Sequence, residues 1–256
     1  MIPQILQLGP LPINSFGLMV ALGIFAAIYS LQRSFKLYEL DPTKAESIVL
    51  LAGVTGIIGA RLLYVLEDWQ SLEGHRWEAL FASAGFTFYG GFILAALIVV
   101  IKSKLQKIPL SIMAATALPA VALGYAIGRL GCQLSGDGDY GIQTKSILGM
   151  SYSTGVVPTP PGILVFPTPL YESVMCLGIA WLLFSIEKQE SWRKQPLRIF
   201  GVGLFLLALE RFFVEFLRIN PKLLDGLSEA QLIALLLAFL GLLFIFIFKT
   251  KTLERS

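Results

Sequence analysis

Hydrophobic residues run along the chain in seven stretches separated by polar segments. Each stretch is long enough, at about 20 residues, to cross the hydrocarbon core of a bilayer. Backbone groups in lipid must be paired internally, so these spans are expected to be helices. The pattern predicts an all-α polytopic membrane protein in which residues 1–256 form a single integral membrane domain. The predicted spans cover residues 13–32, 46–66, 85–101, 111–130, 171–186, 198–217 and 228–248.

The composition agrees with a membrane protein and gives no sign of a nucleic-acid partner. Of the 256 residues, 55% are hydrophobic and only 14% are charged, whereas soluble domains carry about 25% charged residues. The formal net charge of +3 is too small to suggest nucleic-acid binding. Residues 1–4 carry no basic region and no cleavage-site pattern, so we expect no removable signal peptide.

The distribution of basic residues predicts the orientation of the spans, because cytoplasmic loops are enriched in Lys and Arg. The segments after the first, third, fifth and seventh spans hold thirteen such residues, and the segments on the other side hold four. The N-terminus is therefore expected outside and the C-terminus in the cytoplasm. The four basic residues on the predicted outer side are Arg76, Lys145, Arg218 and Lys222.

Three arginines, Arg61, Arg129 and Arg211, fall within predicted spans. An arginine at the centre of a span costs about 2.5–3.5 kcal/mol on insertion scales, and it normally faces the protein interior or a water-filled cavity. The predicted orientation puts all three in the outer halves of their helices. Tyr89 and Glu172 fall at the same predicted depth, so the topology predicts a polar site near the outer leaflet.

The sixth predicted span carries Arg211, Glu215 and Arg218 at positions i, i+4 and i+7, which share one helix face. One interpretation is an internal ion pair that orients the bundle. The other is a phosphate site, since two arginines share one carboxylate here while Arg129 and Arg61 lie at the same depth. Such an excess of guanidinium groups suits a phosphate, which arginine binds through two parallel hydrogen bonds.

A segment of about 40 residues, 131–170, follows Arg129 and contains five prolines. Because helices fix both of its ends, we expect a lid or an element through which substrate enters, instead of a linker. Asp137 and Asp139 in this segment suit either a divalent cation or Asp-Gly turns. We favour the turns.

The chain has two cysteines, Cys132 and Cys176, and one histidine, His75. A structural zinc site needs about four Cys or His ligands, so such a site is nearly excluded. Cys176 lies inside an apolar run, which favours a buried free thiol over a disulfide. We expect no metal and no cofactor, and we expect His75 on the surface.

Residues 128–141 read G-R-L-G-C-Q-L-S-G-D-G-D-Y-G. This stretch resembles the signature of the prolipoprotein diacylglyceryl transferases of bacterial inner membranes, G-R-x-G-N-x-x-N-x-E-x-x-G. Gly128, Arg129 and Gly131 match the signature. Cys132 and Ser135 stand at the two asparagines of the signature, and Asp137 stands at its glutamate. The final glycine, Gly141, comes one residue late.

Other blocks are similar to the family in order and spacing across all seven predicted spans. Residues 167–172, P-T-P-L-Y-E, resemble the family's H-P-[ST]-x-L-Y-E, and residues 211–218 resemble its R-x-x-x-E-x-x-R helix. Blocks at 16–19, 59–61 and 88–91 complete the resemblance. Tyr89 stands where the family often has a histidine that is proposed as the base.

The resemblance implies a multi-pass enzyme of the bacterial inner membrane that needs no cofactor. Such an enzyme transfers the diacylglyceryl group of phosphatidylglycerol to the lipobox cysteine, next to the signal peptide, of a prolipoprotein. Membrane lipids surround it. Arg129 and Arg211 would bind the phosphate, and Tyr89 would complete the catalytic set. The implied substrate-binding residues are Arg61, Cys132, Ser135, Gly136, Asp137, Gly141, Tyr171, Glu172, Glu215 and Arg218.

Two other interpretations remain open. One is a non-catalytic paralogue that binds or transports phospholipid, which the tyrosine at position 89 motivates. The other is a small-solute transporter, which is weaker because the sequence shows no internal repeat and no broken helices.

Overall fold

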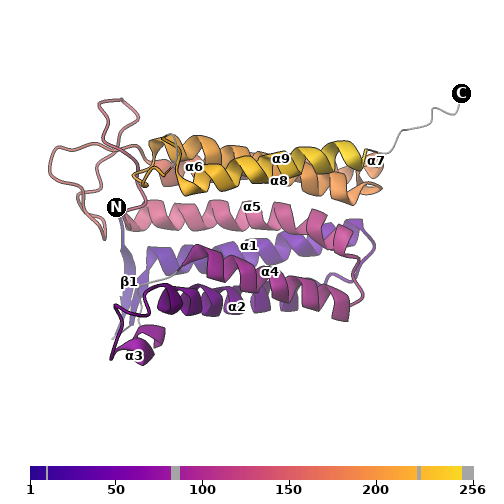
Figure 1. Cartoon of the computed structure of the whole chain (residues 1–256), viewed down its shortest axis with the longest axis horizontal. Helices are drawn as coiled ribbons and strands as arrows, with labels where there is room; N and C mark the ends of the chain where they lie inside the picture. Colours follow the sequence, from indigo (N-terminus) through magenta and orange to yellow (C-terminus); the bar gives the residue numbers. More distant parts are fainter. Residues whose placement is uncertain (10, 82–86, 224–225, 250–256) are drawn as a thin grey trace, which may run out of the picture.

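The computed structural model of the chain describes residues 1–9, 11–81, 87–223 and 226–249. In these ranges, seven α-helices of 18 or more residues run along the long axis of the molecule (Figure 1). They are α1 (Ser15–Leu37), α2 (Lys44–Glu67), α4 (Phe88–Leu105), α5 (Leu110–Ser135), α6 (Thr168–Lys188), α8 (Pro196–Val214) and α9 (Glu229–Ile247). The shorter elements are α3 (Arg76–Phe81), α7 (Glu190–Arg193) and the 3-10 helix η1 (Glu215–Leu217).

Five of the long helices, α1, α2, α5, α6 and α9, are long and apolar enough to cross a membrane. The predicted spans correspond to the seven long helices, with differences at their ends. The largest are that α1 ends at Leu37 instead of residue 32 and that α5 ends at Ser135 instead of residue 130. The predicted start of the third span, residue 85, lies outside the described residues.

The prediction of an all-α chain missed a small sheet at the N-terminus. Strands β1 (Gln4–Leu8) and β2 (Leu11–Asn14) pair antiparallel and lead directly into α1. We call the end of the bundle that holds this sheet, α3 and residues 136–167 the hairpin end (Figure 1). The segments that connect the helices at 38–43, at 106–109 and, through α7, at 189–195 lie at the opposite end (Figure 1).

The predicted boundaries of the long loop, 131–170, were wrong at both ends. Helix α5 continues to Ser135 and α6 begins at Thr168, so the loop spans 136–167. The last turn of α5 stays helical because its polar side chains are buried against other parts of the protein. Gly136 then ends the helix in the left-handed conformation, with φ 62°, and its N–H donates to the carbonyl of Cys132.

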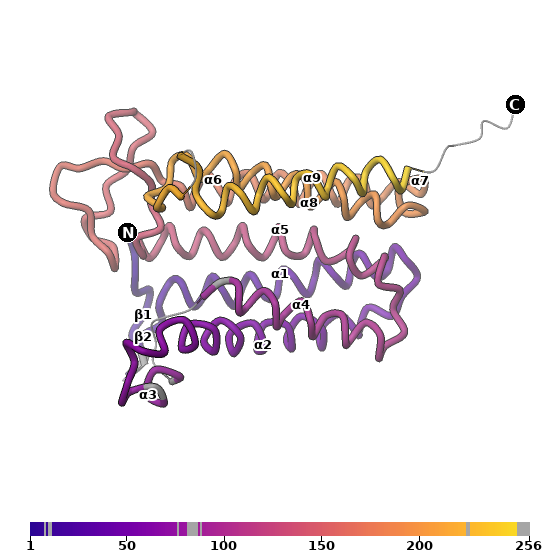
Figure 2. The backbone as a smooth tube through the Cα atoms, in the orientation of Figure 1, coloured from indigo at the N-terminus to yellow at the C-terminus, as the bar shows by residue number. Residues whose placement is uncertain are grey.

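Helix α5 lies between two halves of the bundle (Figure 2). On one side α5 packs along α1, and α2 and α4 pack against each other beside α1. On the other side α5 packs on α6 and α8. Each half has its own apolar core. Leu31, Phe35 and Ile48 belong to the first core, and Leu183 and Ile199 belong to the second.

Helices α2 and α4 approach each other through glycine, as small residues allow between helices in a membrane. A Cβ atom added to Gly90 would clash with the carbonyl oxygen of Gly59 and would lie 2.5 Å from the Cβ of Leu63. The backbones of the two helices are therefore in direct contact at this level. A larger residue at position 90 must push them apart.

We expect Gly90→Ala to destabilise the protein by about 1–3 kcal/mol, the usual cost of an overpacked core. The matched control is Gly178→Ala on α6, where an added Cβ meets nothing within 4 Å. That change should be neutral or slightly stabilising, because alanine favours helix over glycine by about 1 kcal/mol. Thermal unfolding of the purified variants in one detergent compares them, and equal melting temperatures would contradict the close contact.

Candidate functional site

Three predicted site residues, Arg129, Arg211 and Arg218, meet at one carboxylate, that of Glu172 on α6. This side chain is completely buried. Arg129 Nε lies 2.7 Å from its Oε2, and Arg211 Nη1 lies 3.2 Å from its Oε1. Arg218 Nη1 lies 3.5 Å from the same Oε1. Three guanidinium groups, from α5, α8 and the residue after η1, therefore meet at one carboxylate.

Asp139 forms a second bridge between two of these arginines. Arg129 Nη1 pairs with its Oδ2, and Arg218 Nη2 donates to its Oδ1 at 2.9 Å. Asp139 belongs to the loop 136–167, and its side chain is 36% exposed. The loop is thus joined to the end of α5 and to the end of α8 by a single side chain.

Glu215 links the end of α8 to the start of α9. Its Oε2 forms an ion pair with Arg211 Nη2, at 2.9 Å. Its Oε1 accepts from Asn220 Nδ2 at 2.6 Å and from Ser228 Oγ at 2.8 Å. Ser228 also caps α9 in a reciprocal pair with Gln231. The predicted i, i+4 pair of Arg211 and Glu215 is confirmed, although the α-helix ends at Val214 and a 3-10 turn follows it.

The loop 136–167 is folded onto the bundle. The N–H of Ile142 donates to the carbonyl of Leu217 at 2.8 Å, and any side chain at Gly141 would clash with that same carbonyl. Thr168 Oγ1 donates to the carbonyl of Asp139 at 2.7 Å. Deeper in, the buried hydroxyl of Tyr152 donates to Gln133 Oε1 at 2.6 Å. These contacts give Asp139 a defined place above the arginines.

The predicted excess of guanidinium groups is wrong for the described residues. Three arginines face three carboxylates, since Asp139 and Glu172 join Glu215 in the cluster. The prediction considered only the carboxylate on the same helix face as Arg211, whereas the others come from a different helix and a loop. The ion pairs join α5, α6 and the end of α8, which fits the first interpretation, a structural role in the bundle. They do not exclude the second interpretation, in which the same arginines bind a phosphate.

The other signature residues lie at the end of α5 beside the arginines. Cys132 is buried, and its Sγ lies 3.7 Å from Arg129 Nη1. Ser135 Oγ donates to the carbonyl of Cys132 at 3.2 Å. Asp137 Oδ1 accepts from the N–H of Asp139 at 3.3 Å, which confirms the turn that we favoured at Asp137. Both cysteines are free and buried, which confirms the buried free thiol predicted for Cys176.

A cation does not fit the acidic residues of this loop. One ligand atom each from Cys132, Asp137 and Asp139 lies within 4.8 Å of the others. However, both carboxylate oxygens of Asp139 already bind guanidinium groups. Two positive charges at this carboxylate oppose a bound metal ion.

The remaining predicted residues come from other elements. The hydroxyl of Tyr171 on α6 is buried and has no hydrogen-bond partner among the described residues. Tyr89 is 37% exposed near the start of α4, and Glu229, Arg211 and Glu215 are among its electrostatic neighbours.

Arg61 is buried on α2, a helix that packs mainly against α4 and α1. Helix α2 lies across α5 from α6 (Figure 2), so Arg61 and Glu172 are carried by different halves of the bundle. The His75 side chain is 73% exposed and pairs with Glu78, which confirms its predicted surface position.

Three residues in or beside the arginine cluster were not among the predicted site residues. Tyr125 lies four residues before Arg129, accepts a bond from its Nε at 2.9 Å and donates to Glu172 Oε1 at 3.2 Å. Glu210 is buried beside Arg211, and its Oε1 has no hydrogen-bond partner among the described residues. Asp139 was interpreted as a turn residue or a cation ligand, and not as a partner of the arginines. The spacing of Tyr125 and Arg129, i and i+4 on a helix, was the one available signal.

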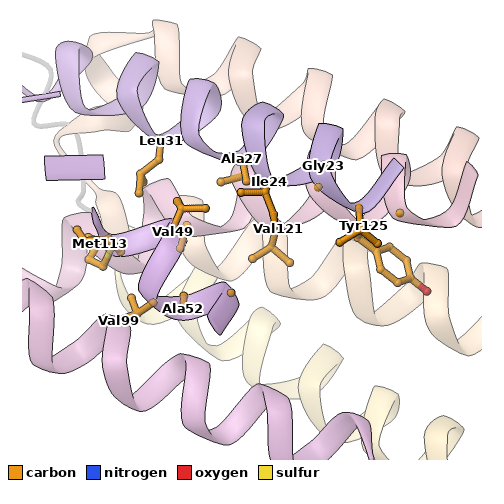
Figure 3. A pocket seen from close by; sticks show the side chains of 17 residues that line it. Gly23, Ile24, Ala27, Leu31, Val49, Ala52, Val99, Met113, Val121 and Tyr125 are labelled. Carbon is orange, nitrogen blue, oxygen red and sulfur yellow. The ribbon is translucent and has the colours of Figure 1, made fainter. Parts of the chain in front are cut away.

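An apolar groove of about 390 Å³ lies next to this polar cluster. Its walls come from α1, α2, α4 and α5, and Tyr125 and Gly128 line the part nearest Arg129. Figure 3 shows Tyr125 at one end of the groove, with its hydroxyl directed away from the other labelled side chains. The groove and the arginine cluster therefore share a boundary at Tyr125. Such an arrangement suits an amphiphile with an anionic headgroup and apolar chains.

The charge state of Asp139 makes the docking of the loop dependent on pH. Burial by itself would raise the pKa of Asp139, but the Arg129 and Arg218 guanidinium groups outweigh burial and hold the pKa below its ordinary value. A carboxyl group whose pKa is lowered on folding stabilises the fold above its unfolded pKa. That contribution is lost as the pH falls through the folded value.

We therefore expect amide hydrogen exchange in residues 136–167 to stay slow from neutral pH down to about pH 4, the unfolded aspartate pKa, and to accelerate below it. The rates must be corrected for the intrinsic pH dependence of exchange, with α6 as the internal reference. Loosening of the loop already at pH values well above the ordinary carboxyl pKa would contradict this expectation.

The family model for prolipoprotein diacylglyceryl transferase matches residues 3–247. The phosphatidylglycerol–prolipoprotein diacylglyceryl transferase of Leptospira interrogans is 28% identical in an alignment of 295 positions, gaps included, that covers 95% of this chain and 91% of the relative. The enzyme of that name from Clostridium tetani is 29% identical and covers 99% of both chains. One from Dehalococcoides mccartyi is 30% identical and covers 92% of this chain and 89% of its own. The chain therefore belongs to the prolipoprotein diacylglyceryl transferase family.

Proposed function

We propose that this chain transfers the diacylglyceryl group of phosphatidylglycerol to the thiol of a lipobox cysteine in a prolipoprotein. The sulfur forms a bond to a glycerol carbon, and the bond between that carbon and the phosphate oxygen breaks. The phosphate keeps the electron pair and leaves as glycerol phosphate, while the thiol proton passes to water or to the phosphate. The meeting of three guanidinium groups at Glu172 carries this proposal.

Arg129 and Arg211 bind the phosphate in this reaction, and Arg218 supports them as a third donor to it. The Arg211 side chain is 30% exposed, which makes it the most accessible of the three. The Nε and Nη1 atoms of Arg218 are buried and donate no hydrogen bond to another described residue. Negative charge grows on the phosphate as it departs, and preorganised donors around that charge lower the barrier.

The apolar groove holds an acyl chain of the donor lipid. Its wall is lined by aliphatic side chains along α1 and α5, and it reaches Tyr125 beside Arg129. A lipid with its tail in the groove has its glycerol near the Tyr125 hydroxyl and its phosphate at the arginines. Cys132, Ser135, Gly136, Asp137, Gly141 and Tyr171 then surround the headgroup, and Arg61 contacts the lipid from α2.

Tyr89 completes the catalytic set as a hydrogen-bond donor. A tyrosine hydroxyl ordinarily has a pKa of about 10, so it keeps its proton at neutral pH and is a poor base. Its position near Arg211 and Glu215 supports a donor role toward the leaving oxygen. A lipobox thiol has an ordinary pKa near 8.5, and the adjacent arginines favour its thiolate.

All seven long helices cross the bacterial inner membrane in this proposal, with the hairpin end outside. The apolar α4 packs along α2, and α8 packs along α9, so both accompany helices that can span a membrane. A membrane-impermeant maleimide applied to intact cells tests the orientation. Lys145→Cys, at the hairpin end, should be labelled, and Lys194→Cys, at the opposite end, should be protected; the reverse pattern contradicts the proposal.

The reaction itself is tested with the purified full-length protein, phosphatidylglycerol and a synthetic lipobox peptide. With label in the acyl chains the peptide should gain the label as a thioether, and with label in the headgroup the label should appear as glycerol phosphate. Rescue of a strain that lacks its own transferase is the test in cells. Bound lipid without any thioether product would instead favour the non-catalytic, lipid-binding paralogue.

A further inference from the structure

The charge balance of the arginine cluster sets a condition on phosphate binding. Three guanidinium groups form ion pairs with the carboxylates of Asp139, Glu172 and Glu215, so their positive charges are already balanced before the neighbouring carboxyl of Glu210 is counted. The lipid phosphate brings a further negative charge into a largely buried site. An uncompensated buried charge is costly. Binding is therefore easier if one carboxylate withdraws.

Glu172 and Glu215 are poorly suited to withdraw. Both are completely buried, Glu172 on a helix and Glu215 in the 3-10 turn η1. Glu172 also accepts a bond from Tyr125, and Glu215 accepts bonds from Asn220 and Ser228. Moving either one leaves buried donors without acceptors, which is unfavourable.

Asp139 is the carboxylate that can leave. Its side chain is 36% exposed and lies on a loop. Its two oxygens bridge Arg129 and Arg218, which come from separate elements. Two oxygens of a phosphate bind a pair of guanidinium groups in the same manner. Asp139 thus occupies the position that an anionic headgroup needs.

We propose that Asp139 is an internal ligand of Arg129 and Arg218, which the phosphate of a bound lipid or of glycerol phosphate displaces. The inference rests on the proposed function for the identity of the anion. Once displaced, the Asp139 side chain turns to solvent and the loop loses its ion pairs to α5 and to the end of α8. The remaining contacts, including the Tyr152–Gln133 hydrogen bond, keep the base of the loop in place.

The first test measures phosphate affinity. Asp139→Asn keeps the shape of the side chain but removes the competing charge, so glycerol 1-phosphate should bind the purified protein roughly three- to tenfold more tightly. Glu78→Gln is the control, because it removes a carboxylate at the same end of the bundle. The Glu78 side chain is 78% exposed and pairs with His75. The affinity of this variant for glycerol 1-phosphate should equal that of the wild type. A purely structural Asp139 predicts weaker binding in Asp139→Asn.

The second test uses a cleavage site that the loop already contains. Lys145 is exposed and is the only Lys or Arg between residues 136 and 167, so trypsin can cut this loop at one place. Glycerol 1-phosphate should accelerate cleavage of the wild type at Lys145 several-fold. Asp139→Asn should be cleaved at the accelerated rate without ligand and should respond no further.

The choice of nanodisc lipid shows whether the displacing phosphate comes from a lipid headgroup or from free glycerol 1-phosphate. In nanodiscs of phosphatidylcholine alone, cleavage at Lys145 reports free glycerol 1-phosphate when it is added. In nanodiscs that also contain phosphatidylglycerol, accelerated cleavage without added ligand identifies the lipid headgroup as the displacing group. If only free glycerol 1-phosphate accelerates cleavage, then Asp139 is displaced by the product of the reaction and not by the donor lipid.

The outcomes keep this inference distinct from the proposed function. The displacement of Asp139 is overturned if Asp139→Asn binds glycerol 1-phosphate no more tightly than the wild type does. It is also overturned if glycerol 1-phosphate does not change the rate of cleavage at Lys145. Either result counts even if the wild type makes the thioether product. Failure of the wild type to make that product overturns the transferase proposal. In that case the binding and cleavage measurements still decide whether Asp139 yields to a phosphate.

Discussion

Arg129→Ala is expected to lower diacylglyceryl transfer by roughly 100- to 1,000-fold, the usual cost of removing one preorganised donor to a developing negative charge. Arg129 contacts Glu172, Asp139 and Tyr125 at once, so its guanidinium group is held firmly in place. Arg129→Lys keeps the charge but loses the planar two-point grip on phosphate, and it should recover only part of the rate. Initial rates of thioether formation on the lipobox peptide measure both variants.

The matched control for this change is Arg33→Ala at the opposite end of the bundle. Arg33 Nη1 lies 3.2 Å from Oε2 of Glu187, a completely buried carboxylate. Its loss breaks a comparable ion pair and should lower the melting temperature, but it should leave the rate per folded molecule unchanged. Transfer at the wild-type rate by folded Arg129→Ala protein would remove Arg129 from the proposed mechanism.

Glu172→Ala is expected to have the largest effect on stability, a loss of about 3–5 kcal/mol, which is typical when one partner of a buried ion pair is removed. Three arginines lose the carboxylate at which they meet, and they are left as partly buried positive charges. Little folded protein should accumulate in the membrane. Glu172→Gln keeps the side-chain volume and should lose less, and thermal unfolding in detergent ranks the two variants.

Glu210→Gln is the control for Glu172, since it neutralises a second buried carboxylate near the same arginines. One oxygen of Glu210 has no hydrogen-bond partner in the described part of the chain, so the loss of charge there should change the melting temperature little. If Glu172→Ala were as stable as Glu210→Gln, the arginines would not depend on Glu172 for their arrangement.

The long helices could be predicted from the sequence because their apolar runs are long and are interrupted by polar turns. The ends of α5 and α6 could not, because polar side chains such as Gln133 and Thr168 resemble loop residues until their partners are known. Gln133 bonds Tyr152 and Thr168 bonds the carbonyl of Asp139, contacts that span 19 and 29 residues of sequence. Pairings at that separation leave no local pattern.

The arginines of the site were predictable, and their partners were not. Arg129 and Arg211 stand out in the sequence because charged groups within apolar spans are costly. Asp139 does not, since an aspartate beside glycine in a loop is usually a turn residue. Its position between Arg129 and Arg218 depends on how the loop folds back over α5, with Gly141 against the carbonyl of Leu217. The charge balance of the arginines therefore emerged only from the three-dimensional arrangement.

Helix α5 supplies both a wall of the apolar groove and the arginine beside it. Any substitution that tilts or shifts this helix must change both how the groove binds the acyl chain and how the arginine binds the headgroup. Donor preference for acyl length and for polar head should consequently be inherited as a coupled pair, and variants selected for shorter-tailed donors should change their tolerance of headgroups as well.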